Sequence, residues 1–287
     1  MTDPAGSGPP ASPGRRSGLG GWVGAVLAGC GVALFALLRA AYLITGEIHL
    51  LPALVVVGTS TVPVGFAAWL WSRYPPMLAG RRVPSAGALV GAGLAGGALA
   101  LALSGLGEYA AIGTGSSVSP LVVGTVEEVA KLIPAVALVL WYARITADAG
   151  LLRVGLLSGV AVGAGFAVLE TLGYAYAAAH EQDASLATVD QLLLVRGIFS
   201  PATHLTWTAL GAAAAAGLVL ALQRRRGVVL AVAVLVGTVL AVIATHAVWD
   251  RSETVLAHVA LAVVGLTALW LVDSRLGRST TGSRRTG

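Results

Sequence analysis

Charged residues are scarce in this sequence. Only 11% of its 287 residues are charged, whereas soluble domains carry about 25%. The chain has one lysine, Lys131, and one cysteine, Cys30, so an intrachain disulfide is excluded. The shortage of charge and the long apolar runs exclude an ordinary soluble domain. They indicate an all-α polytopic membrane protein whose immediate partner is the lipid bilayer.

The apolar runs predict about eight transmembrane helices. Each run is long enough to cross about 30 Å of hydrocarbon at about 1.5 Å per residue. They form one transmembrane domain, residues 22–272, between a Gly-, Pro- and Ser-rich tail, residues 1–21, expected to be disordered, and a basic tail, residues 273–287. The predicted helices lie near residues 22–45, 50–71, 86–107, 120–142, 152–180, 192–222, 228–250 and 254–272.

The arginines predict the orientation of these helices. Fourteen of the 17 arginines fall on one side of the predicted membrane. Basic loops stay in the cytoplasm, so both termini are expected there. The same placement accounts for the net charge of +5 without a nucleic-acid partner. Arginine in place of lysine is typical of GC-rich bacterial genomes, and we expect a multi-pass protein of the bacterial cytoplasmic membrane. The fourteen are Arg15, Arg16, Arg73, Arg81, Arg82, Arg144, Arg153, Arg224, Arg225, Arg226, Arg275, Arg278, Arg284 and Arg285.

Ionisable residues lie inside four of the predicted helices. Each costs roughly 2.5–3.5 kcal/mol at the centre of a membrane helix, so such residues usually mark function. Glu127 and Glu170 each lie 17 residues from the nearest cytoplasmic arginine, and His204 and His246 each lie 20 residues away. At about 1.5 Å per residue, all four lie roughly 25–30 Å from the cytoplasmic face. The full set is Glu127, Glu128 and Lys131, then Glu170, then Arg196 and His204, and then His246 and Asp250.

Local spacing predicts how these side chains pair. Lys131 follows Glu128 by three residues and Glu127 by four, so it can neutralise one of the two carboxylates. The same four-residue spacing lets Asp250 orient His246. Pro201 is expected to kink its helix just before His204. Taken singly, these residues could be structural ion pairs or hydrogen bonds between packed helices. Their common depth favours a functional cavity.

The motifs resemble those of one known family. "EEVAK", residues 127–131, matches EExxK, and "FAVLE", Phe166–Glu170, matches FxxxE. His204 and "HAVWD", His246–Asp250, supply histidines on two later helices. In this order the motifs resemble the PrsW family of intramembrane proteases, which is related to the type II CAAX prenyl endopeptidases and the bacteriocin-processing enzymes. The resemblance covers roughly residues 120–272.

This resemblance implies a glutamate-dependent hydrolase. Glu127 or Glu128 would be the general base, and His204 and His246 would stabilise the oxyanion or complete a polar cage. Glu170 stands where the CAAX enzymes have histidine. Lys131, Asp250 and Phe166 would support these catalytic residues. The implied substrate is a single-pass membrane protein, similar to an anti-sigma factor, cut near its extracytoplasmic side.

Three alternatives remain open from the sequence. Glu128, Glu170, His204 and His246 could form a zinc site of a metalloprotease. The sequence has no HExxH motif, and Lys131 would repel a cation, so we expect no cofactor. A proton- or ion-coupled transporter also uses buried Glu, His and Lys side chains, but the inner third of the four helices is almost purely apolar. A non-enzymatic scaffold or sensor would leave the aligned charges unexplained.

Overall fold

The protein was analysed as a computed structural model. It describes residues 19–74, 84–113, 119–145, 150–180 and 186–282. These segments contain helices and no strand. In chain order the elements are α1 (Leu19–Thr45), α2 (Leu50–Arg73), α3 (Ala86–Gly91), η1 (Ala92–Gly96), α4 (Gly97–Ile112), α5 (Pro120–Ala143), α6 (Gly150–His180), α7 (Leu186–Leu192), η2 (Leu193–Ile198), η3 (Ser200–Ala202), α8 (His204–Arg224), α9 (Val228–Arg251) and α10 (Val255–Gly282).

The predicted helical membrane fold is confirmed. Within the described residues, 7 helical segments are long and apolar enough to cross a membrane, with α3, η1 and α4 forming one of them and α7 to α8 another. Helix α5 has 24 residues, as many as α2 and α9, but it carries Glu127, Glu128 and Lys131. It occupies the position of the fourth predicted helix. The orientation of the termini stays a prediction, since residues 1–18 and 283–287 lie outside the described part of the chain.

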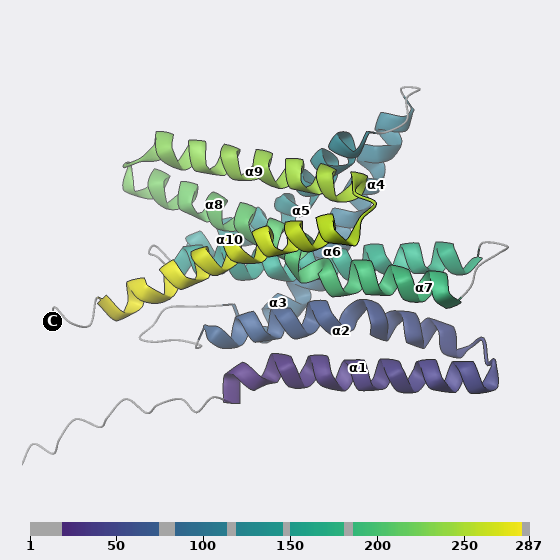
Figure 1. Ribbon diagram of the computed structural model, residues 1–287. Coiled ribbons are helices and arrows are strands. Elements are labelled where there is room, and N and C mark those ends of the chain that lie inside the picture. The colour runs from purple at the N-terminus through teal and green to yellow at the C-terminus, as the bar shows by residue number, and fades with distance from the viewer. Residues whose placement is uncertain (1–18, 75–83, 114–118, 146–149, 181–185, 283–287) are drawn as a thin grey trace, which may run out of the picture.

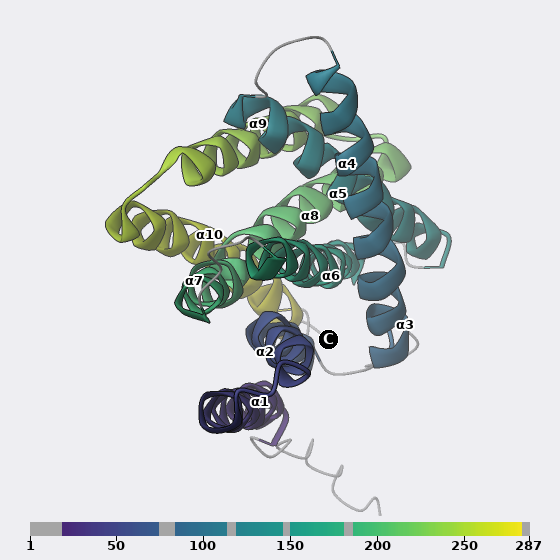
Figure 2. The same ribbon diagram turned by 90° about the vertical axis from the view of Figure 1, so that its right-hand side faces the viewer.

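Helix α6 lies at the centre of the bundle. In its most apolar stretch 78% of the residues are buried, compared with 6% in α1. Helices α2, α5 and α8 pack against α6, while α1 packs on α2 at the edge of the molecule (Figures 1 and 2). The central helix therefore carries Glu170 into the interior, and α1 is left mainly to face lipid.

Helices α6 and α8 pack with their backbones close together. Gly155, Gly159 and Gly163 recur every four residues along α6, the spacing that lets membrane helices approach closely. A Cβ atom on Gly163 would lie 2.5 Å from the carbonyl oxygen of His204. Any side chain there would push the two helices apart. This stripe thus fixes where His204 lies relative to α6.

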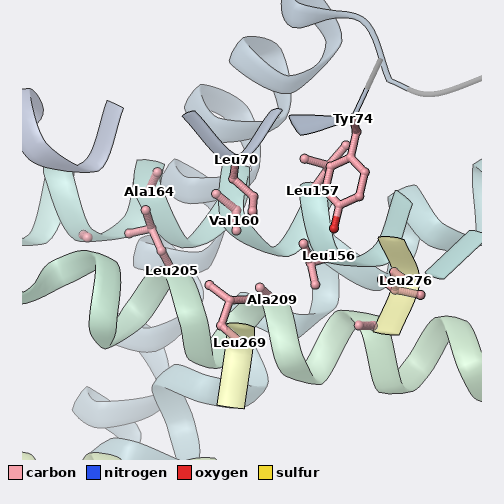
Figure 3. Packing of buried hydrophobic residues seen from close by; sticks show 12 residues of the cluster. Leu70, Tyr74, Leu156, Leu157, Val160, Ala164, Leu205, Ala209, Leu269 and Leu276 are labelled. Carbon is pink, nitrogen blue, oxygen red and sulfur yellow. The ribbon is translucent and has the colours of Figure 1, made fainter. Parts of the chain in front are cut away.

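Polar contacts join the C-terminal end of α2 to α10. Nη2 of Arg73 lies 2.8 Å from Oδ2 of Asp273, and the Tyr74 hydroxyl donates to Oδ1. Burial and the Asp273 carboxylate raise the pKa of Tyr74, so its hydroxyl remains a donor. Figure 3 shows Tyr74 within an apolar cluster that joins α2, α6, α8 and α10.

These contacts also explain a difference from the sequence prediction. The last helix was expected to end at residue 272, before a basic tail. Helix α10 instead continues to Gly282. Asp273, the first residue of the expected tail, is buried in its ion pair with Arg73 and is therefore part of the helical packing.

Candidate active site

Helix α5 places three ionisable side chains on one buried face. Nζ of Lys131 lies 2.5 Å from Oε1 of Glu128 and 3.4 Å from Oε2 of Glu127. The lysine side chain is fully buried, and its ammonium group lies 4.5 Å from the centre of the Phe166 ring. A buried charge needs such partners. The sequence predicts that Lys131 neutralises one of the two carboxylates, and the shorter contact is with Glu128.

Glu170 on α6 contacts one side chain with each of its carboxylate oxygens. Its Oε1 atom lies 2.5 Å from Nη2 of Arg196, and its Oε2 atom lies 3.2 Å from Nε2 of His204. Phe166, one turn earlier on α6, is fully buried, and its ring centre lies 5.4 Å from that of His204. The FxxxE motif therefore supplies one carboxylate and one packing surface to the same site.

The helix before His204 is interrupted, as Pro201 predicts. A π-helical turn, Leu193–Ile198, and a 3-10 turn, Ser200–Ala202, precede the start of α8 at His204. The Ser200 hydroxyl donates to the carbonyl of Gly197 over 2.9 Å, so a carbonyl that loses its helical partner is satisfied locally. Irregular backbone at membrane depth is tolerated where it lines a polar site. By contrast, α5 continues unbroken through Pro134.

His246 on α9 lies between carboxylates. Its Nδ1 atom is 2.8 Å from Oε1 of Glu128, while its Nε2 atom is 3.6 Å from Oε2 of Glu127 and 3.4 Å from Oδ2 of Asp250. The predicted contact with Asp250 is therefore present. Glu128 is shared between Lys131 and His246, which leaves Glu127 with the longer contacts.

Four helices thus bring together all the residues expected from the sequence. Trp207 was not predicted to belong to this group, yet its ring centre lies 5.1 Å from that of His246 and 5.9 Å from that of His204. Its position one turn after His204 is compatible with a simple core residue, so the sequence carries no special signal for it. Arg39 lies outside this group and forms an ion pair with Asp190, with 2.8 Å between Nη2 and Oδ2.

Among the described residues, three side chains lie close enough to share a metal ion. Ligand atoms of Glu127, Glu170 and His204 all lie within 4.8 Å of one another. The zinc set expected from the sequence was Glu128, Glu170, His204 and His246. The structure differs because Glu128 faces Lys131 and His246. Two carboxylates and an imidazole are suitable zinc ligands by type.

Lys131 argues against a metal ion in this arrangement. Its Nζ atom lies 2.9 Å from Nδ1 of His204. An ammonium group has no lone pair, so Nδ1 accepts and the ring proton resides on Nε2, facing Glu170. A metal ion at Nε2 would therefore have to displace this ring proton.

The fold and the buried Glu–Lys–His cluster define a membrane-embedded hydrolase. The family described as PrsW family intramembrane metalloprotease matches residues 81–272, two thirds of the chain. The chain belongs to this family and is an intramembrane protease. No match was found among curated proteins or among solved structures.

Proposed function

We propose that this protein cuts a single-pass membrane protein near its extracytoplasmic side, with Glu127 activating the attacking water and without a metal ion. An anti-sigma factor is the kind of substrate that the family resemblance implies. The expected depth of the site, in the outer half of the bilayer, supports cleavage near that face. The family assignment supports proteolysis in general, and the contacts of the two adjacent glutamates support the choice of base.

The unequal contacts of Glu127 and Glu128 carry this proposal. Oε1 of Glu128 lies 2.5 Å from Lys131 and 2.8 Å from His246, so one oxygen is held by two partners. The corresponding distances from Oε2 of Glu127 are 3.4 Å and 3.6 Å. A carboxylate held that tightly is a poor proton acceptor. Glu127 is therefore the better base, and Glu128 is better suited to fix Lys131 and His246.

The reaction then follows ordinary general-base chemistry. Glu127 takes a proton from water while the water oxygen bonds to the scissile carbonyl carbon. The carbonyl oxygen becomes an oxyanion, which the polar cage that includes His204 and His246 stabilises. Glu127 returns the proton to the amide nitrogen, and the C–N bond breaks to leave a carboxyl group and an amine. Glu170 and Asp250 hold the two imidazoles in position.

Exchange of each glutamate in the native host tests this proposal. The chromosomal copy is replaced by wild type, Glu127→Gln, Glu128→Gln or, as a control, Glu253→Gln, an exposed glutamate outside the site. Mass spectrometry of new protein termini in the membrane fraction identifies substrates. We expect termini at the outer ends of single transmembrane segments with wild type and Glu253→Gln, and their loss with Glu127→Gln. Unchanged cleavage by both Glu127→Gln and Glu128→Gln would refute the assigned site.

A further inference from the structure

A long apolar groove of about 610 Å³ lies between α8, α9 and α10. Helices α9 and α10 meet at the turn after Arg251 and diverge from it, with α8 lying alongside both (Figures 1 and 2). The groove lining contains no charged side chain, and Thr238 and Thr245 are its only polar side chains. Such a lining suits an occupant from the hydrocarbon layer.

The groove is as long as a membrane-crossing segment. Its lining runs from Gly227, the residue before α9, to Thr245 of α9, which corresponds to about 27 Å at about 1.5 Å per residue. The hydrocarbon core of a bilayer is about 30 Å thick. Ala213, Ala214 and Gly217 of α8 also line the groove, and small residues let a second helix approach closely.

Trp207 connects this groove to the catalytic cluster. It lines the groove and is only 3% exposed. The same indole ring also packs against His246, with 5.1 Å between ring centres. One indole ring therefore separates the groove from a catalytic imidazole. A groove that only binds lipid would not need to share a residue with the catalytic cluster.

We propose that the groove between α8, α9 and α10 binds the transmembrane helix of the substrate and that Trp207 forms the partition between this helix and the histidines. The inference rests on the proposed function, because it names where the substrate of that same site lies. Glu128 and His246 are each 1% exposed, so a substrate helix needs a path from the bilayer. The groove offers one that ends beside His246.

Two adjacent valines on α10 allow a matched binding test. Val264 lines the groove and is 60% exposed, whereas Val263 is 59% exposed and does not line it. In a Cys30→Ser background, Val264→Cys or Val263→Cys is labelled with a fluorophore, and the protein is reconstituted in vesicles. The probe is a synthetic helix of about 20 leucine and alanine residues, flanked by lysines, with a central nitroxide.

We expect the nitroxide peptide to quench the label at position 264 several-fold more than the label at position 263. A nitroxide on a lipid acyl chain should quench both labels equally. Equal quenching by the peptide at both positions overturns the proposal. The nitroxide lipid could instead quench the label at position 264 preferentially. If the same peptide without its nitroxide does not relieve that quenching, the groove is a lipid site and the proposal is overturned.

A cleavage test uses a second matched pair, on α9. Val234 lines the groove and Val236 does not, and both are 50% exposed. With a substrate identified in the native host, Val234→Trp should raise KM about tenfold, equivalent to about 1.4 kcal/mol of binding, with kcat little changed. Val236→Trp should behave as wild type. Equal KM values for the two variants overturn the groove assignment.

The two tests separate this proposal from the proposed function. Peptide binding does not require catalysis. Selective quenching at position 264 without cleavage of any membrane protein would support the groove and refute the protease mechanism. Cleavage that requires Glu127, combined with unselective quenching, would support the mechanism and refute the groove.

Discussion

Arg196 and Glu170 form a close ion pair inside the bundle, with 2.5 Å between Nη2 and Oε1. The Arg196 guanidinium also lies 4.2 Å from the centre of the Tyr174 ring. The other carboxylate oxygen of Glu170 lies 3.2 Å from Nε2 of His204. Arg196 does not itself face Lys131 or the other histidine in any of these contacts. In the proposed mechanism Arg196 would therefore act on the site by fixing Glu170, which in turn would position His204.

Arg196→Met should lower kcat and destabilise the protein, because it leaves the Glu170 carboxylate buried without its cation. Removing one partner of a buried pair typically costs about 3–5 kcal/mol. The double variant Arg196→Met with Glu170→Gln should regain stability but not kcat. Thermal unfolding in detergent and cleavage kinetics measure the two effects. Full activity of the double variant would show that Arg196 and Glu170 are structural only.

Lys131 should be required for both folding and activity. Its ammonium group contacts Glu127, Glu128 and His204, so Lys131→Met leaves two adjacent buried carboxylates without a cation. We expect a loss of stability of about 3–5 kcal/mol and of most cleavage. Lys131→Arg should retain part of the activity, because the charge survives although its shape changes. Expression level, unfolding temperature and cleavage are measured together.

One result for Lys131→Met would contradict this prediction. Wild-type expression and activity in this variant would contradict the account of the charge cluster. Arg144→Met is a suitable control, since Arg144 lies at the end of α5 and is exposed. That variant removes a positive charge from the same helix without touching the site.

The helices and the clustering of the ionisable residues could be predicted from the sequence because both depend on insertion into a bilayer. Apolar runs set the helices, and distance from the cytoplasmic arginines sets the depth of Glu127, Glu170, His204 and His246. Depth alone does not determine how each helix is rotated about its axis. That rotation comes from side-chain packing, such as the Gly163 contact with His204.

The rotation of each helix about its axis explains the features of the site that the sequence did not predict. It places Glu127, rather than Glu128, beside Glu170 and His204, so this candidate metal group differs from the predicted zinc set, which contained Glu128 and also His246. It also brings Trp207 against His246. The extent of α10 was also missed, because the contacts of Asp273 with Arg73 and Tyr74 are long-range and do not appear in the local sequence.

The orientation of the protein is tested by reporter fusions. The loop at residues 108–119 is expected on the extracytoplasmic side, because the basic loops are assigned to the cytoplasm. An alkaline phosphatase fused after Ser117, which lies outside the described residues, should be active, whereas the same fusion after Arg226 should be inactive. Phosphatase activity requires export, so this assay reads the side directly. Reversed activities would place both termini outside and the active site near the cytoplasmic face.

Removal of metal ions should leave cleavage unchanged. Lys131 donates to Nδ1 of His204, and Nε2 of the same ring faces Glu170, so zinc binding to this imidazole would require the loss of a ring proton next to a buried ammonium group. The reconstituted protease is measured with an identified substrate before and after exhaustive dialysis against a strong zinc chelator, and its metal content is measured by mass spectrometry. A zinc-dependent peptidase treated in parallel controls for effective chelation. Activity that falls with the chelator and returns with stoichiometric zinc would establish the metalloprotease alternative, with Glu127, Glu170 and His204 as its ligands.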